Sequence, residues 1–495
     1  MQFRNAISAV ILFAAMVSSG KAVAQLAVQP IRLHPKNPHY FLFRGKAVAL
    51  VTSGEHYGAL LNPDFDYRKY LDTLEKDGHN YTRIFGGSYV EVPEKSFGIK
   101  RNDLAPAQGR FLAPWVRSSQ DGYAGGGNKF DLSRWNLAYF DRLHDFLEEA
   151  SKHGIVVEIS LFSSQYGEEQ WKLSPFHPGN NVNQTREIDW KRTHTLDNGN
   201  ILEWQENYTR KLVAAAAGFD NVIFEIQNEP WSDRPVLAGV QNPYLFPPSR
   251  DRFPNAIEIA DPDSIAWQKR VAQWISTAEA ALPSRHLIAQ NICNFGVPVR
   301  ETIAEASILN FHYAFPGAAL WNYGLDKAIS YDETGFLGTN DEAYRRQAWN
   351  FMLSGGSAFD GLDYSFNVGR EDGSDAEPNG PGGGSPALRK QLGTLSAFLQ
   401  KFPLLEMKPD AEAVKYSGAA FARVLSSGTK SYAVYLDGDA DKIVMNLAAG
   451  EYSAEWLNVV GGEVASLEKF VHKGGEKTLV VPKYESGIAL QLLRK

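Results

Sequence analysis

The sequence has 495 residues but only one cysteine, Cys293. A single thiol cannot form a disulfide within the chain, and it cannot supply the paired cysteines of a structural zinc site. The fold must therefore be stabilised by a packed core. With 44% hydrophobic residues, the chain carries enough apolar material for one large domain and a smaller one.

Positive charge is also scarce. Lys and Arg number 50 against 57 Asp and Glu, which gives a formal net charge of −7. A nucleic-acid-binding domain would instead be basic. The chain also lacks the His-Glu-x-x-His, Walker-type and Gly-x-Ser-x-Gly patterns, so zinc protease, nucleotide-binding and serine hydrolase functions are not indicated.

The sequence contains no convincing metal-binding motif. The segment Asp437–Asp441 has the acidic spacing of a calcium loop, but Lys442 and Ala448 stand where such a loop needs a glycine and a glutamate. We therefore expect neither a metal nor another cofactor. Nothing in the sequence indicates the oligomeric state.

Long hydrophobic runs are missing except near the N-terminus. There, Arg4 precedes the apolar run Ala6–Val17, and an Ala-Val-Ala sequence at 22–24 follows it. This layout predicts a signal peptide over residues 1–24, cleaved before Gln25, and the run is shorter than the roughly 20 residues of a membrane-spanning helix. We expect an exported protein, periplasmic or extracellular, with no membrane span. An uncleaved N-terminal anchor is the alternative.

Short apolar runs alternate with amphipathic stretches over residues 25–403, which is typical of strand-helix units around a parallel sheet. Helical spacing is clearest in Tyr67–Asp77 and Leu137–His153. The pattern predicts an α/β fold, a (β/α)8 TIM barrel. Its eight expected strands are Ala47–Thr52, Tyr81–Phe85, Ile155–Leu161, Val222–Ile226, Leu287–Gln290, Ile308–Phe311, Ala328–Tyr331 and Ala358–Leu362.

The pattern changes over residues 404–495 to an alternation of period two, broken by turns. This predicts a small all-β antiparallel sandwich domain. Its clearest strands are Phe421–Leu425, Tyr432–Leu436, Ile443–Leu447 and Thr478–Val481.

Long polar or aromatic segments follow four of the barrel strands and precede helices. Loops in this position gather at the C-terminal face of a barrel, where such enzymes carry their active sites. We therefore expect the active site there. The four segments span residues 86–129, 163–200, 231–264 and 367–386.

Glu229 directly follows the fourth predicted strand, in Phe-Glu-Ile-Gln-Asn-Glu-Pro. Pro230 cannot continue the ladder, so Asn228 and Glu229 should stand at the barrel rim. Apolar neighbours Phe224 and Trp231 should raise the pKa of Glu229, as a general acid requires. The alternative is a glutamate that only interacts with the N-terminus of the following helix.

Glu333 lies at the end of the seventh predicted strand, in Ser-Tyr-Asp-Glu-Thr-Gly. Because side chains alternate along a strand, Tyr331 and Glu333 should share one face and Asp332 the other. Only one of the two acids should then enter the site, and Glu333 is nearer the C-terminal rim. A solvated loop glutamate is the alternative.

Glutamates on strands four and seven would face each other across the barrel mouth. A retaining glycoside hydrolase needs carboxyl groups about 5–5.5 Å apart, and an inverting enzyme about 6.5–9.5 Å. The sequence cannot distinguish these separations.

These motifs resemble those of glycoside hydrolase clan A, the cellulase-like (β/α)8-barrel retaining glycosidases. Asn228-Glu229 and Glu333 match the clan's strand-four and strand-seven positions, and Gly78-His-Asn80-Tyr-Thr-Arg83 is similar to its Gly-x-Asn-x-x-Arg. The resemblance implies that Glu229 is the acid/base and Glu333 the nucleophile. It also implies that Arg83 hydrogen-bonds the nucleophile and keeps it ionised, as a guanidinium beside a carboxylate would.

Two departures from the clan concern the substrate. His312-Tyr313 is similar to the clan's His-x-Tyr, but Ala314 takes the tyrosine position, so either Tyr313 or Tyr331 could contact the nucleophile. The eighth strand, 358–362, carries no tryptophan to lie under the sugar. We expect a specificity different from that of familiar cellulases and mannanases.

The C-terminal region with Tyr452–Trp456 looks like the trailing domain of cellulase-like bacterial hydrolases that is labelled collagen-binding. That label does not indicate collagen binding here.

Aromatic residues are frequent in the strand-to-helix loops, where they could support the apolar faces of sugar rings or pack beneath the loops. They are Trp115, Tyr166, Trp171, Trp190, Trp231, Trp321 and Tyr323. The residues expected to bind substrate are Arg83, Asn228, His312, Tyr313, Tyr331, His56, Trp231, Trp321 and Tyr166.

The sequence thus predicts an exported retaining glycoside hydrolase that acts on an oligo- or polysaccharide, with exo attack slightly favoured by the long loops. A non-catalytic carbohydrate-binding protein on a hydrolase-like barrel is one alternative. A transglycosylase, which would use the same intermediate, is another.

Overall fold

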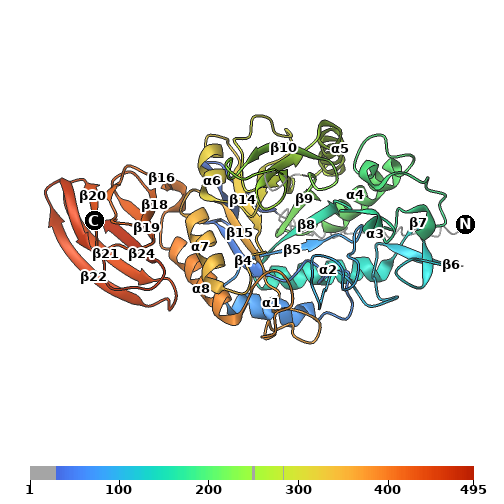
Figure 1. The fold of residues 1–495 in the computed structure, drawn as a ribbon, viewed down its shortest axis with the longest axis horizontal. Helices are drawn as coiled ribbons and strands as arrows, with labels where there is room; N and C mark the ends of the chain where they lie inside the picture. Colours follow the sequence, from blue (N-terminus) through green and yellow to red (C-terminus); the bar gives the residue numbers. More distant parts are fainter. Residues whose placement is uncertain (1–28, 248–250, 283) are drawn as a thin grey trace, which may run out of the picture.

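The computed structural model describes residues 29–247, 251–282 and 284–495. The signal peptide expected over residues 1–24 lies outside the described residues. Figure 1 shows a helix-covered barrel with antiparallel sheets at one end. None of the helices in the described ranges has the length and hydrophobicity that crossing a bilayer requires.

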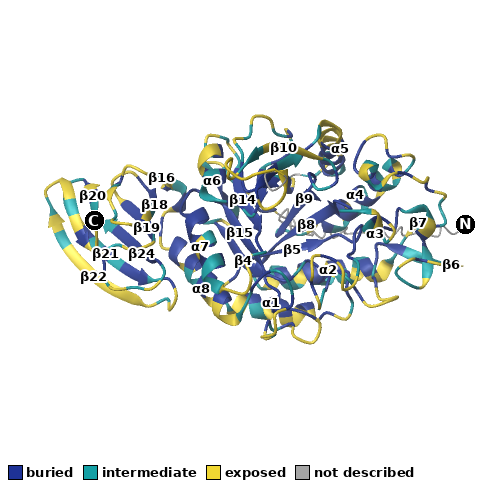
Figure 2. Ribbon diagram, in the orientation of Figure 1, coloured by how far each residue is buried: buried dark blue, intermediate teal, exposed yellow. Residues whose placement is uncertain are grey.

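Eight parallel strands form the barrel, in the order β4-β15-β14-β13-β12-β9-β8-β5. They are buried along almost their whole length, as Figure 2 shows. The predicted (β/α)8 fold class is therefore confirmed. The strands are β4 (Leu50–Gly54), β5 (Tyr81–Phe85), β8 (Val156–Ser163), β9 (Val222–Asn228), β12 (Leu287–Asn294), β13 (Ile308–His312), β14 (Ala328–Glu333) and β15 (Ala358–Leu362).

The first barrel strand differs from its prediction. It begins at Leu50, and the preceding Lys46–Val48 forms β3, which pairs with β2 (Asn37–Phe43) in a small separate sheet with β1 (Arg32–His34). The apolar run Ala47–Thr52 thus contributes residues to two sheets. Hydrophobicity alone does not show where the chain passes from one sheet to the other.

An asparagine side chain helps to close the barrel between β4 and β5, whose backbones do not form a regular ladder. The Val51 amide donates to Asn80 Oδ1 at 2.9 Å, and Asn80 Nδ2 donates to the Ala49 carbonyl at 2.9 Å. The asparagine of the Gly-His-Asn motif therefore replaces missing backbone hydrogen bonds at the seam.

Seven helices cover the barrel, while the fully described stretch between β12 and β13 contains none. Aspartates cap the first turns of two of these helices. The Asp66 side chain accepts backbone N–H hydrogen bonds at the start of α1, and the Asp261 side chain accepts one at the start of α5. The helices are α1 (Tyr67–Lys76), α2 (Leu137–Lys152), α4 (Leu202–Ala216), α5 (Pro262–Ala278), α6 (Pro316–Asn322), α7 (Asp341–Met352) and α8 (Pro386–Leu399).

The long loops carry structure of their own at the C-terminal ends of the strands. The loop after β5 contains the hairpin β6 (Trp115–Asp121) and β7 (Asn128–Trp135), and the loop after β8 contains the short helix α3 (Glu168–Trp171). The loop after β9 contains β10 (Pro235–Val240) and β11 (Ala256–Ala260), of which β11 also pairs with β12. These segments build the walls around the barrel mouth.

Two antiparallel sheets follow the barrel and share one core, as expected of a sandwich. The outer strand β22 is almost wholly exposed, as Figure 2 shows. A boundary near residue 403 remains a prediction. The first sheet contains β16 (Lys408–Pro409), β18 (Phe421–Ser426), β19 (Ser431–Asp437), β24 (Ile488–Arg494), β21 (Gly450–Asn458) and β22 (Val464–His472), and the second β17 (Val414–Tyr416), β20 (Lys442–Leu447) and β23 (Gly475–Val480).

Candidate active site

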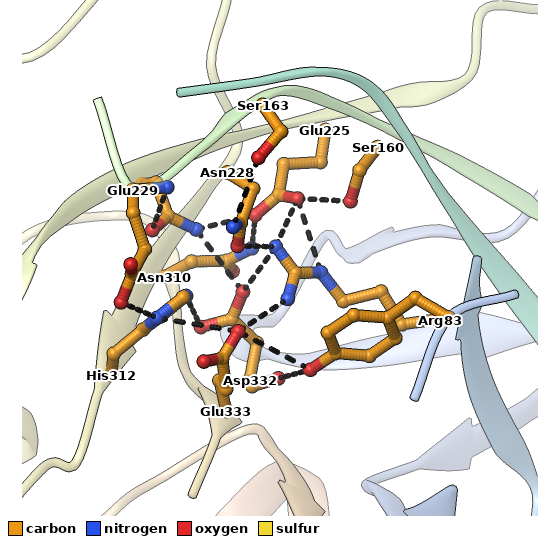
Figure 3. A network of polar contacts seen from close by, with 12 residues as sticks. Arg83, Ser160, Ser163, Glu225, Asn228, Glu229, Asn310, His312, Asp332 and Glu333 are labelled. Carbon is orange, nitrogen blue, oxygen red and sulfur yellow. Dashed lines mark hydrogen bonds and ion pairs between the residues drawn. The ribbon is translucent and has the colours of Figure 1, made fainter. Parts of the chain in front are cut away.

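The C-terminal ends of four barrel strands bring the predicted polar residues together. Arg83 comes from β5, Asn228 from β9, His312 from β13 and Glu333 from β14. Glu229 follows β9 directly. Figure 3 shows these side chains converging in one network of hydrogen bonds and ion pairs.

The two predicted catalytic glutamates face each other. Their carboxylates and the His312 ring each offer an atom within 4.8 Å of the other two. Tyr313 bridges the pair, because its hydroxyl lies 2.9 Å from Glu333 Oε1 and 3.4 Å from Glu229 Oε1. Both glutamates are less than 9% exposed. The two carboxylates therefore lie close enough to contact the same small ligand.

Arg83 holds the nucleophile candidate in position. Its Nη1 lies 3.2 Å from Glu333 Oε2, and its Nη2 donates to Asn228 Oδ1 at 2.7 Å. Nε donates to Glu225 at 3.1 Å, and the guanidinium lies 4.7 Å from the centre of the Tyr57 ring. The fully buried charge is thus paired and hydrogen-bonded, as a buried arginine must be.

The alternation expected for β14 is broken, and this corrects the prediction for Asp332. Phe311 pairs with Tyr331 but His312 pairs with Glu333, so Asp332 is an extra residue in a bulge. Asp332 and Glu333 therefore both face the barrel interior and both form ion pairs with Arg83.

Tyr331 consequently lies away from the site. Its ring packs edge-on against Phe351 and Phe359, and within the described ranges its hydroxyl has no hydrogen-bond partner. Of the two tyrosines left open by the sequence, Tyr313 is the one that contacts Glu333.

His312 lies among three carboxylates. Nδ1 is 2.9 Å from Glu229 and 3.5 Å from Glu333, and Nε2 is 3.5 Å from Asp332. Burial lowers the pKa of His312, but these negative charges outweigh it and raise the pKa well above the usual value. The surrounding carboxylates therefore favour the charged form of His312.

The pKa directions of the glutamates differ from those expected. Burial alone would raise the pKa of Glu229, but the His312 hydrogen bond and charge hold it below the usual value, so the predicted increase is wrong. Burial raises the pKa of Glu333, and the Glu229 charge adds to this, so that His312 and Arg83 offset it only in part.

A second group of acids lies deeper in the barrel and was missed by sequence reasoning. Glu158 and Glu225 come from β8 and β9, and Asp360 comes from β15. Burial raises the pKa of all three. The only sequence signal was an acid in the middle of each apolar strand, which alternation places on the inner face.

Two acid-rich groups have the spacing of a metal site: Glu229 with His312 and Glu333, and Glu158 with Glu225 and Asp332. In both, positive charge is already supplied by the protein. His312 is a member of the first group, and Arg83 pairs with Glu225 and Asp332 of the second.

The carboxylates open into a small cavity with aromatic walls. Its volume is about 30 Å³, more than the roughly 10–15 Å³ that a single water molecule needs. Phe97 and Phe336 line it in edge-to-face contact, 6.5 Å apart between ring centres. The lining residues are His56, Tyr57, Phe85, Tyr89, Glu91, Phe97, Tyr166, Asn228, Glu229, Tyr313, Glu333, Phe336, Leu362 and Tyr364.

Several lining residues adopt a left-handed backbone, which costs a side-chain-bearing residue energy. They include Tyr166 (φ 57°), Glu229 (φ 46°), Tyr313 (φ 51°) and Phe336 (φ 62°). Such strain is commonly held at functional sites, where the surrounding structure imposes it.

The remaining predicted residues divide into those at the cavity and those outside it. His56 and Tyr166 line it, and Asn228 Nδ2 donates to the Tyr166 hydroxyl at 2.7 Å. Trp231 lies behind the site against the edge of His312, whereas Trp321 is 54% exposed and packs on Phe315 outside the cavity.

The other aromatic residues in the loops either pack in the core beneath the loops or line the catalytic cavity without having been predicted to do so. Trp115 and Trp171 are fully buried beneath the loops. Tyr364, which follows β15, lines the cavity. Phe97 and Phe336 gave no sequence signal, because an isolated loop phenylalanine has no spacing to identify it.

No protein-family model matches the sequence, and no curated protein matches it. Solved structures nevertheless share the fold. A candidate glycoside hydrolase from Bacteroides vulgatus ATCC 8482 is 13% identical with a TM-score of 0.64, over 94% of this chain and 83% of that one. A glycoside hydrolase family 5 protein from the same organism is 12% identical with a TM-score of 0.61, over 94% and 93% of the two chains.

The fold is shared with glycoside hydrolases. A further structure described as a glycoside hydrolase is 12% identical with a TM-score of 0.61, over 94% of this chain and 97% of that one. Since each match covers 94% of this chain, it includes most of the C-terminal sheets as well as the barrel. At such low identities the likeness concerns the fold.

Proposed function

We propose that this protein is a retaining glycoside hydrolase that cleaves O-glycosidic bonds by double displacement. The observation that carries the proposal is the pair Glu229 and Glu333. They stand at the ends of β9 and β14, with oxygen atoms within 4.8 Å, in a cavity lined by aromatic rings. The shared fold and the neighbours described as glycoside hydrolases support the reaction class.

In the first step, Glu333 attacks the anomeric carbon while Glu229 protonates the departing glycosidic oxygen. The carbon–oxygen bond to the leaving group breaks, and an ester between the sugar and Glu333 forms. In the second step, Glu229 takes a proton from water, whose oxygen attacks the same carbon and releases Glu333. Two inversions give net retention.

The hydrogen-bond contacts of the two glutamates support the proposed roles. Arg83 and Tyr313 donate hydrogen bonds to Glu333, which favour an ionised nucleophile. Glu229 needs a proton before it can act as the acid. Protonated His312, 2.9 Å away, can supply it when substrate enters.

The preferred mode of attack is inferred from the loops around the aromatic cavity. Long loops follow β5, β8, β9 and β15 at the barrel mouth, and they favour recognition of one terminal residue. Exo attack is therefore part of the proposal, as is export directed by residues 1–24. Transglycosylation would follow the same first step with a sugar as acceptor. Retention of both glutamates argues against a purely binding role.

Paired variants test the mechanism and the roles. Glu333→Gln should abolish hydrolysis of every aryl glycoside that the protein cleaves. Glu229→Gln should still form the glycosyl ester from substrates with good leaving groups, and added azide should restore turnover with retained configuration. NMR of the first-formed sugar should show the retained anomer. Undiminished activity of Glu333→Gln, or an inverted product, would reject the proposal.

A further inference from the structure

A second, much larger cavity lies beside the catalytic one. It measures about 1270 Å³ and shares the walls Tyr313 and Phe336 with the catalytic cavity. This exceeds the roughly 300–1,000 Å³ of pockets for drug-sized ligands. The space can therefore hold the parts of a longer substrate that extend beyond the reacting sugar.

The barrel and the C-terminal sheets form this cavity jointly. The barrel contributes loops after β9, β12, β13 and β14 together with one side of α7. The C-terminal sheet contributes Phe421 and Arg423 from β18 and Asp437 from the end of β19. Figure 1 shows these sheets standing against α7 at one end of the barrel.

Its charge is opposite to that of the chain. Three arginines, Arg252, Arg346 and Arg423, and one carboxylate, Asp437, line it, a net charge of +2 in a chain of net charge −7. The carboxylate is already engaged, since Asp437 accepts hydrogen bonds from Arg346 at 2.7 Å and from Asn350 at 2.8 Å. Arg346 therefore has a carboxylate partner, whereas no ion pair is found for Arg252 or Arg423 among the described residues.

Arg423 is the arginine best placed to use that charge. Its Nε donates to Asn350 Oδ1 at 3.1 Å, which fixes the plane of the guanidinium. Within the described ranges, no hydrogen-bond or ion-pair partner is found for its two terminal nitrogens. Burial lowers its pKa, with Asp437 opposing this, so an added anion would stabilise the charged form. A guanidinium with two free nitrogens matches a carboxylate or sulfate in a bidentate pair.

Exposed aromatic rings accompany the arginines. Phe421 is 69% exposed on β18, and Phe253 is 45% exposed beside the shared wall, 5.3 Å from Tyr313 and 5.9 Å from Phe336 between ring centres. Large exposed rings that line a cavity are suited to the apolar faces of sugars.

We propose that this interdomain cavity binds an anionic sugar, carrying a carboxylate or sulfate group, of the same glycan chain that is cleaved between Glu229 and Glu333, and that Arg423 pairs with the anionic group. This inference rests on the proposed glycosidase function and deepens it. It makes the C-terminal sheet a part of the substrate site.

Binding is measured by calorimetry at low ionic strength in the Glu333→Gln background, so that no probe is cleaved. The probes are galacturonic acid oligomers and their carboxyl-reduced forms, and chondroitin sulfate oligomers and their desulfated forms. At least one charged probe should bind tighter than its neutral form by a factor of about 10 or more. The probe pair in which the charged form binds more tightly shows whether the cavity prefers a carboxylate or a sulfate group.

Arg423→Gln should remove that preference, Arg423→Lys should keep part of it, and Arg270→Gln should leave it unchanged. Arg270 is an exposed arginine on α5 that does not line the cavity, so it controls for net charge. Equal binding of charged and neutral forms, no binding of any probe, or a preference that survives Arg423→Gln would each overturn the inference.

The glycosidase function is tested separately in the active enzyme with small neutral aryl glycosides, which carry no anionic group for Arg423 to bind. Arg423→Gln should hydrolyse them with unchanged kcat/KM, while its KM for a charged oligosaccharide rises with little change in kcat. If the enzyme hydrolyses aryl glycosides but binds charged and neutral probes equally, the anionic subsite is rejected and the glycosidase function is not. Failure to hydrolyse any glycoside rejects the proposed function itself.

Discussion

Tyr313 shows how a single residue resolves an ambiguity in the motif. Its hydroxyl donates to Glu333 Oε1 at 2.9 Å. In the His-x-Tyr motif the tyrosine position is taken by Ala314, one residue after Tyr313. The left-handed backbone of Tyr313, with φ 51°, is what turns the ring back over the carboxylates. Sequence spacing alone could not show this, because regular strand geometry places neighbouring side chains on opposite faces.

The residue-scale prediction concerns this hydrogen bond. Tyr313→Phe should lower kcat by a factor of about 10 to 100, since a hydrogen bond to a charged group contributes about 1.5–3 kcal/mol. Steady-state kinetics on an aryl glycoside measures the loss.

Tyr331→Phe is the matched control. It removes a hydroxyl for which no partner is found within the described ranges, and it should leave kcat unchanged. A stronger loss in Tyr331→Phe than in Tyr313→Phe would contradict the assignment of Tyr313 to the site.

At the scale of elements, the sequence predicts most of the barrel, because each buried strand is a short apolar run bounded by turns. β5 and β15 begin and end where expected. The helix α1 ends one residue early, at Lys76. The sequence could not show the bulge in β14. The bulge changes the sides of the strand to which Asp332 and Tyr331 point, and the hydrophobicity pattern gives no sign of it.

The interior faces of the strands carry another unexpected feature, a group of buried acids. Glu158 on β8 accepts hydrogen bonds from Tyr81 at 2.5 Å and from Asn310 at 2.7 Å. Burial raises its pKa to about 8, and the Glu225 charge contributes. The folded state therefore holds a proton on Glu158 that the unfolded chain releases near its usual pKa of about 4.3.

The stability contribution of this proton has a definite sign. Because the unfolded state binds fewer protons between about pH 4.3 and 8, folding stability should fall as pH rises through that window. Glu158→Gln is neutral at every pH and can keep both contacts, donating to Tyr81 and accepting from Asn310.

Thermal unfolding should therefore show Glu158→Gln gaining in Tm relative to the wild type between pH 4.5 and 8.5. Asp121→Asn, on the exposed end of β6, is the control and should show no such trend. A difference between Glu158→Gln and the wild type that is independent of pH would contradict the protonated Glu158.

At the scale of the whole molecule, the barrel and the C-terminal sheets pack as one body. One apolar core runs from α7 and α8 into the sheet and includes Trp349, Tyr435 and Ala489. Trp349 stacks on Tyr435 with ring centres 5.4 Å apart. Polar contacts border this core, with Arg346 donating to Asp437 at 2.7 Å. Alternating hydrophobicity predicted two units but could not show that they share a core.

This shared core predicts a single cooperative unfolding transition. Tyr435 is fully buried, and removing a buried aromatic ring costs about 3–5 kcal/mol. Tyr435→Ala should therefore lower the Tm of the whole protein in scanning calorimetry, and barrel and sheets should still unfold together.

Tyr416→Ala, which removes a half-exposed ring on β17, should cost less than about 0.5 kcal/mol, as surface changes usually do. Two separate transitions in the wild type, with only one shifted by Tyr435→Ala, would show that the barrel does not depend on this contact. The anionic subsite would then lie between two independently folding units, and its geometry would not be fixed by the fold.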